Sequence, residues 1–174
     1  MRTALSVLTI VLAAAVAMPA YAQTVEDYDT AKAALDESWN QLPLSFTNVR
    51  FVTEATGFGV YTEKADAIFK DGEPVTLYAE PLGFKFAKTD DDQNSFGFNF
   101  DFKLKNPAGD VLSEKPDFLK TEMKSHSENH EFYVMLTLNL KGAPAGDYVL
   151  EYTGHDLSSA ETAEISVPFT LAAP

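Results

Sequence analysis

One short stretch of the chain carries two histidines and a glutamate at alternate positions. His126, Glu128 and His130 form a His-x-Glu-x-His pattern. On a β-strand, alternate side chains share a face, so these three would offer two imidazoles and a carboxylate to one ion. Such a donor set suits zinc or copper. The surrounding Ser and Asn residues have turn composition, however, and in a turn the spacing loses this meaning. Exposed loop histidines are therefore the alternative.

An acidic run gives a second candidate metal site. Asp90, Asp92 and Asn94 have the alternate spacing of calcium ligands, and Asp101 stands further along at the position of a last ligand. Hard oxygens at such spacing can surround calcium. An EF-hand is excluded, because Ser95 occupies the position that needs Gly and a strand pattern follows where a helix should. A looser calcium site in a loop and a solvated turn both stay open.

The sequence offers no recognisable catalytic motif. His155, Asp156, Ser158 and Ser159 are the residue types of a hydrolase triad, but triad members converge from separate elements and these share one short turn. The chain has no Cys, and no glycine-rich phosphate loop is present. We therefore expect a protein that is not an enzyme, with no cofactor beyond the calcium, zinc or copper ions considered above.

The charge of the chain narrows the choice of partner. There are 13 basic and 26 acidic residues, a net charge of −13. Nucleic acid and anionic lipid both favour basic surfaces, so neither is expected as a partner. A cationic partner or a divalent cation would fit this charge, and plain solubility would also explain it.

The first residues predict export. Arg2 precedes an apolar run, Leu5 to Val16, and Ala20-Tyr21-Ala22 has the pattern of a cleavage site. This combination predicts a secretory signal peptide over residues 1–22. The apolar run is too short for a comfortable membrane anchor, so we expect no membrane span after cleavage. The mature chain is expected to be periplasmic or secreted.

The mature chain divides into a helical segment and a β-rich domain. Residues 23–43 have an apolar stripe at three- and four-residue steps, and Thr24 with Asp27 has capping-box spacing. From residue 44 to 174 the period changes to two, most clearly in 96–104 and 132–140. The apolar phase shifts near Thr47-Asn48, which suggests a bulge or a break.

Two segments resemble a known group of folds. Residues 69–75 and 144–171, with Tyr148 after a Pro/Gly turn, are similar to the hairpins of bacterial immunoglobulin-like or fibronectin-type-III-like domains. The resemblance implies that Tyr148 forms a tyrosine corner, its hydroxyl bonded to nearby backbone. The chain departs from true immunoglobulin domains because it lacks both cysteines and has its Trp in the helical segment.

These observations together predict an all-β protein. We expect an antiparallel immunoglobulin-like β-sandwich of seven to nine strands with one N-terminal α-helix; a barrel is the alternative. The expected function is that of an exported, non-enzymatic binding or structural module of the cell envelope, whose partner is another envelope protein. The alternative is a periplasmic carrier of a small apolar ligand, held between the aromatic faces, or of a divalent metal ion.

Overall fold

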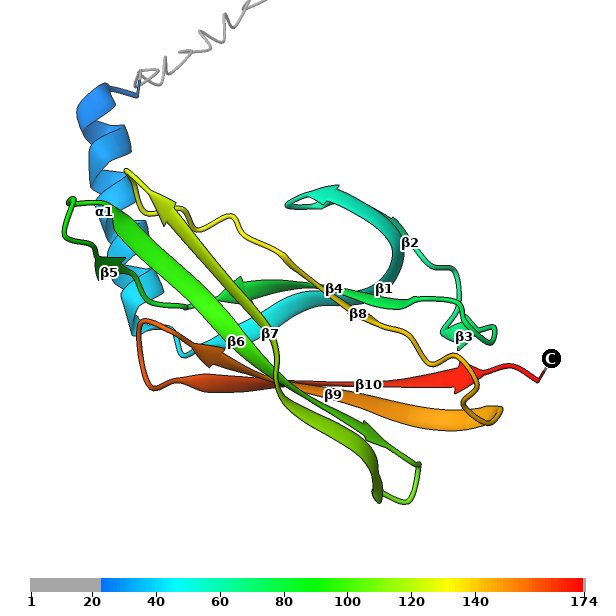
Figure 1. Cartoon of the computed structure of the whole chain (residues 1–174). Helices are drawn as coiled ribbons and strands as arrows, with labels where there is room; N and C mark the ends of the chain where they lie inside the picture. Colours follow the sequence, from blue (N-terminus) through cyan, green and yellow to red (C-terminus); the bar gives the residue numbers. More distant parts are fainter. Residues whose placement is uncertain (1–22, 174) are drawn as a thin grey trace, which may run out of the picture.

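The structure, a computed structural model, describes residues 23–173 as one helix and ten strands in two sheets (Figure 1). The expected signal peptide, residues 1–22, lies outside the described residues. The all-β class is confirmed. The strand number exceeds the expected seven to nine, because three strands are too short to show any alternation. The elements are α1 (Val25–Gln41), β1 (Ser45–Gly57), β2 (Val60–Glu63), β3 (Ile68–Phe69), β4 (Val75–Leu82), β5 (Ala87–Lys88), β6 (Asn94–Lys105), β7 (Val111–Ser125), β8 (Val134–Leu138), β9 (Gly146–Asp156) and β10 (Thr162–Leu171).

The two sheets have different sizes. The first has the strand order β2-β1-β4-β8, and the second has the order β3-β10-β9-β6-β5; β7 also belongs to the second sheet and pairs with β6. Every pairing is antiparallel except that of β3 with β10. Strand β6 is the centre of the second sheet, because β9 and β7 flank it along most of its length.

The core lies between the sheets and is rich in aromatic rings. The apolar face predicted for β6 is buried throughout, from Phe96 to Leu104. Phe84 stacks on Phe96 with ring centroids 4.7 Å apart, and Phe132 stacks on Phe98 at 6.1 Å. Each ring therefore has aromatic neighbours within the core. Burial of these side chains is the main source of stability in a chain without disulfides.

Strand β1 bends sharply, so that the first sheet curls into a half-barrel (Figure 1). Its register with β4 shifts between Thr47 and Arg50, and Asn48 has a φ of 48°. This is the bulge that the phase shift near Thr47-Asn48 predicted. Further shifts on the side of β2 increase the bend. As a result, the β1–β2 hairpin folds back over the outer face of β4.

A cluster of polar side chains holds this hairpin in place. Tyr78 is fully buried on the outer face of β4; its hydroxyl donates to Glu80 at 2.6 Å and accepts from the Gly59 amide at 2.8 Å. The second oxygen of Glu80 accepts from the Asn48 side chain at 2.5 Å. The ring of Tyr61 lies 4.6 Å from that of Tyr78. Two effects raise the pKa of Tyr78 to about 12: burial, which is the larger, and the hydrogen bond to Glu80.

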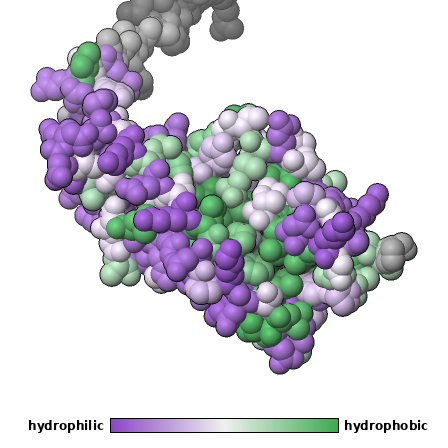
Figure 2. All heavy atoms as spheres, in the orientation of Figure 1, coloured by the Kyte–Doolittle hydropathy of each residue, from purple (hydrophilic) through white to green (hydrophobic). Residues whose placement is uncertain are grey.

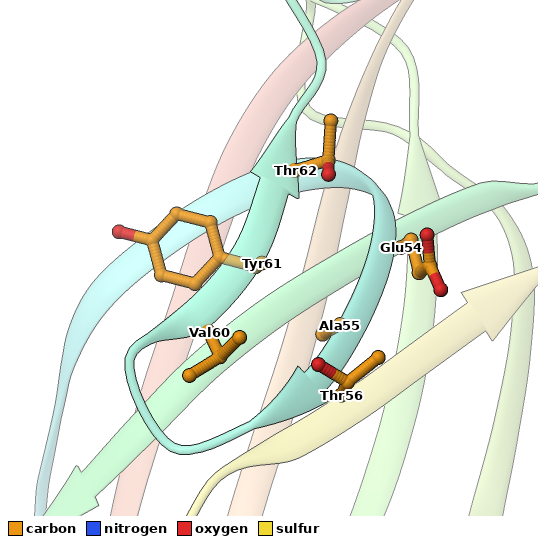
Figure 3. Close-up of a pocket in the computed structure, with 6 residues that line it drawn as sticks. All are labelled: Glu54, Ala55, Thr56, Val60, Tyr61 and Thr62. Atoms are coloured by element: carbon orange, nitrogen blue, oxygen red, sulfur yellow. The ribbon is translucent and has the colours of Figure 1, made fainter.

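The curled hairpin also encloses a small surface hollow between its two arms (Figure 3). Glu54 is the only charged side chain of this hollow, and no histidine faces it. The hollow is open to solvent along one side. The residues that line it are Glu54, Ala55, Thr56, Val60, Tyr61 and Thr62.

Two further features bear on the fold. The Tyr148 hydroxyl donates to the Pro144 carbonyl at 2.6 Å, which is the tyrosine-corner bond expected from the resemblance. Among the strands that the structure describes, β7 pairs with β6 alone, and it is exposed over its first half. Pro116 and Asp117, which has a φ of 50°, interrupt its ladder in the middle.

Candidate functional site

Three segments far apart in the sequence meet at one end of the molecule. Helix α1, the turn at residues 89–93 and the connection at residues 126–133 lie together there (Figure 1). The Asn94 side chain donates to the His126 carbonyl at 3.3 Å, which joins the turn to the connection. The ring of His130 lies 4.3 Å from that of Trp39, which joins the connection to the helix. Both loops proposed from the sequence as metal sites are therefore at this end.

The helix is fixed to the body through its last turns. Thr24 and Asp27 form the expected capping box at its start, and Trp39 near its end is 6 % exposed. The Trp39 indole N–H donates to the Phe84 carbonyl at 2.8 Å. The Lys85 ammonium donates to the carbonyls of Asn40 and Leu42, at 3.1 and 2.9 Å, and so caps the C-terminus.

The first turns of α1 expose apolar side chains. Val25, Tyr28 and Leu35 are 78, 66 and 55 % exposed. Tyr28 and Leu35 are spaced by seven residues, so they lie in one line along the helix, and Leu42, the extended C-cap residue, follows just beyond its end. Trp39, on the adjoining side, turns into the body instead. We call Val25, Tyr28, Leu35 and Leu42 the apolar flank of α1.

This end of the molecule is strongly acidic. The helix, the turn and the connection carry ten acidic side chains and one basic side chain. Hydrophilic side chains dominate the helix and the adjoining surface in Figure 2. The apolar flank therefore lies within a field of negative charge. The acidic residues are Glu26, Asp27, Asp29, Asp36, Glu37, Asp90, Asp91, Asp92, Glu128 and Glu131; the basic residue is Lys32, and Lys85, Lys88 and Lys124 lie beside these segments.

The structure gives the histidine motif a different geometry from the one its spacing suggested. Strand β7 ends at Ser125, and residues 126–133 form no strand. His126 is exposed and takes no part in the cluster that forms around His130. Glu128 and His130 converge instead with Asp36 of helix α1, their ligand atoms within 4.8 Å of one another. Asp36 was missed because nothing in the sequence near the histidines points to a helix so far upstream.

The imidazole of His130 lies in an aromatic setting. It contacts Trp39, and the ring of Phe86 meets it edge-on at 5.5 Å. Its Nδ1 is 3.9 Å from Oδ1 of Asp36. The other oxygen of Asp36 accepts from the Lys32 ammonium at 2.8 Å, and this bond raises the pKa of Lys32. Asp36 Oδ1 and His130 Nε2 are buried and have no hydrogen-bond partner among residues 23–173.

The proposed calcium ligands do not converge in the same way. Asp90 and Asp92 are exposed in the turn, where Asp92 has a φ of 57°. Asn94 is buried on β6, and its amide group binds the His126 carbonyl. Asp101 lies further along β6, where its carboxylate binds His155 at 2.9 Å.

The residues of triad type are also separated by the fold. Asp156 is buried and accepts from the Lys85 amide and the Ser159 hydroxyl, both at 2.9 Å. His155 points to the other side of β9, toward Asp101. Two hydrogen bonds hold the pKa of Asp101 below its usual range: the one from the Asp117 amide, which has the larger effect, and the one to His155. Neither Ser158 nor Ser159 is bonded to His155 in the described part of the chain.

Comparisons with known proteins identify no family. No protein-family model matches the chain, and no curated protein is significantly similar. A Pseudomonas fluorescens alkylpurine DNA glycosylase bound to DNA is 12 % identical with a TM-score of 0.38, over 86 % of this chain and 40 % of the glycosylase. The superoxide reductase (neelaredoxin) of Ignicoccus hospitalis is 10 % identical with a TM-score of 0.35, over 87 % of this chain and all of that one. Likenesses at this level carry no argument about function. Within residues 23–173, no helix has the length and apolar character needed to cross a membrane.

Proposed function

We propose that this protein is an exported, non-enzymatic binding module of the cell envelope, and that it binds its partner through the acidic end. The partner surface has apolar side chains flanked by Lys or Arg. One observation carries the proposal, namely the apolar flank of α1, which stays exposed within a cluster of ten acidic side chains. Exposed apolar side chains gathered on one surface mark interaction sites more often than scattered ones do.

The charge around the flank defines the kind of partner. Acidic side chains surrounding an apolar contact attract basic surfaces during encounter and disfavour acidic ones. The apolar side chains then supply the contact area from which binding energy comes. The seven-residue spacing of Tyr28 and Leu35 on α1 fits a partner that presents a helix of similar period.

We also infer that the two sheets form an immunoglobulin-like sandwich in which the first sheet is unusually curled. The tyrosine-corner bond between Tyr148 and Pro144 supports this arrangement. In such sandwiches the loops gather at the two ends, and loops at one end commonly form binding surfaces. The acidic end, where two loops join the helix, corresponds to one of these ends.

Two matched leucines provide the test. Leu35 on the flank and Leu112 on β7 are 55 and 53 % exposed, so a change to Ser removes the same side chain from either surface. The mature chain and both variants are immobilised, and captured proteins from an envelope extract of the native host are identified. We expect Leu35→Ser to abolish capture of a specific exported protein and Leu112→Ser to preserve it. Raised salt should weaken the capture, because the charged groups are exposed.

The proposal has a clear contrary outcome. If both leucine variants capture the same proteins as the native chain, the flank is not the binding surface. If capture is insensitive to salt, the acidic side chains do not contribute to it.

A further inference from the structure

The junction between helix α1 and the β7–β8 connection brings metal-ligating side chains together. One histidine and two carboxylates, from segments far apart in the sequence, place a ligand atom each within a 4.8 Å group. It is the one such group of His, Asp and Glu found among residues 23–173. We infer that Asp36, Glu128 and His130 bind one divalent transition-metal ion of the zinc class.

The unsatisfied polar atoms support this assignment. Buried polar atoms in folded proteins almost always have a hydrogen-bond partner, and an exception requires a reason. Asp36 Oδ1 is buried without a partner in the described part of the chain and faces Nδ1 of His130; the other imidazole nitrogen, Nε2, is also unpaired but is not the one nearest this carboxylate. Arg50, Asn99 and Tyr152 each have one such atom as well, but none of them belongs to a group of convergent ligands. An ion at the junction would satisfy the Asp36 oxygen directly.

The donor set selects the class of ion. An imidazole nitrogen with two carboxylate oxygens matches the ligand types of zinc, copper and nickel, whereas calcium and magnesium prefer oxygen alone. A tetrahedral zinc ion with bonds of about 2.1 Å holds its ligand atoms about 3.4 Å apart. Asp36 Oδ1 and His130 Nδ1 are already 3.9 Å apart. Glu128 is exposed and free to close the remaining distance.

The neighbours of the cluster position it for one ion. Trp39 and Phe86 pack on the imidazole and restrict its orientation. Lys32 binds Oδ2 of Asp36, so the inner oxygen, Oδ1, is the one left for a metal. Three protein ligands leave a coordination position open, which an exchangeable water or a partner side chain would fill. The bound ion would fasten the helix to the connection.

Replacing His126 serves as the control for replacing His130. His126 and His130 lie in the same connection, but only His130 belongs to the cluster. Tag-free mature chain is titrated with Zn²⁺ by calorimetry and with Cu²⁺ by fluorescence, since Cu²⁺ quenches a nearby indole. Trp39 is the only Trp in the sequence and its ring lies 4.3 Å from that of His130, so its emission reports on this site. The variants are His130→Gln, Glu128→Gln and His126→Gln, and Ca²⁺ and Mg²⁺ serve as comparison ions.

We expect one Zn²⁺ per folded chain and quenching of Trp39 by Cu²⁺. His130→Gln and Glu128→Gln should each weaken binding at least about tenfold, and His126→Gln should leave it unchanged. Glu128 is exposed, so its variant stays folded even if His130→Gln does not. The inference is overturned if the folded chain binds no Zn²⁺, if His126→Gln weakens binding as much as His130→Gln, or if Ca²⁺ binds equally well. The probe is the ion alone, so failure to find a protein partner does not affect this result.

Discussion

Two polar clusters in this molecule differ in how their buried atoms are satisfied. On the outer face of β4, the Tyr78 hydroxyl has both a donor and an acceptor, and both oxygens of Glu80 accept bonds. At the helix junction, Asp36 and His130 face each other with one unpaired buried atom each. The first cluster is complete and holds a hairpin in place. The second is incomplete, because it leaves buried atoms unpaired, and such exceptions require an explanation; the ion inferred above would supply one for Asp36.

The largest expected loss of stability follows from removing Trp39, which packs against His130 of the incomplete cluster. Trp39→Ala removes a buried indole that contacts Phe84 and His130, and it leaves the Phe84 carbonyl without its donor. We expect a loss of about 3–5 kcal/mol in the free energy of unfolding. Denaturant unfolding followed by far-UV circular dichroism measures it. The control is Leu35→Ala on the exposed flank, expected within about 0.5 kcal/mol. An equal loss for both variants would mean that the apolar flank contributes to the packing of the helix.

Removing one hydroxyl from the complete cluster should have the next largest effect. Tyr78→Phe keeps the buried ring but leaves Glu80 and the Gly59 amide each one bond short. We expect a loss of about 1–3 kcal/mol, because an unsatisfied buried group bears its full desolvation cost. Tyr133→Phe on the neighbouring ring serves as the control, since its hydroxyl makes no hydrogen bond among the described residues. If Tyr78→Phe is neutral, the hairpin is held by its backbone alone.

The complete cluster should also respond to alkaline pH. The pKa of Tyr78 is raised from about 10 in the unfolded chain to about 12 in the fold. Between these values the unfolded chain has released the proton and the fold retains it, so stability falls by about 1.4 kcal/mol per pH unit. Burial raises the pKa of Tyr152 as well, in the same direction. Unfolding of the native chain and of Tyr78→Phe, compared from pH 9 to 12, isolates the Tyr78 part. If stability falls equally steeply with pH in both proteins, Tyr78 does not contribute to the pH dependence.

The smallest expected change in stability is that of replacing His130, and it contrasts most directly with the effect of Tyr78→Phe. His130→Phe places an apolar ring against Trp39 and Phe86 and removes an imidazole nitrogen that already lacks a partner. In chelator-treated protein we expect a change within about 1 kcal/mol, of either sign. Differential scanning calorimetry measures it. A loss as large as that of Tyr78→Phe would show that His130 is part of the fold in its own right, and the two clusters would then be alike.

Much of the fold could be predicted from the sequence because its signals are local. The alternation of Phe and polar residues in β6 reports directly on a half-buried strand, and Thr24 with Asp27 marks the start of the helix. The phase shift at Thr47-Asn48 located the bulge in β1. Strand β7 has no such signal. It is an exposed edge strand interrupted by Pro116, so neither of its faces carries the apolar alternation that marks a buried one.

The candidate site could be predicted only in part, for a related reason. Glu128 and His130 were identified from their residue types, but their partner was assigned to His126 from the spacing of a strand that does not form. The true neighbour, Asp36, is one turn from Trp39 on the face of the helix that meets the body. Its proximity depends on how the helix docks, and docking is a tertiary property that no short sequence pattern contains.

The interrupted edge of β7 has a consequence for how the protein behaves at high concentration. A long edge strand offers unpaired backbone groups to any other extended chain, and long flat edges lead to aggregation. In β7, Pro116 removes a donor, the left-handed backbone at Asp117 twists the strand, and Lys115 and Lys120 add charge nearby. These are the devices by which natural sheets avoid edge-to-edge assembly. Strand β7 can therefore lie at the edge of the larger sheet without offering a continuous row of backbone groups to another extended chain.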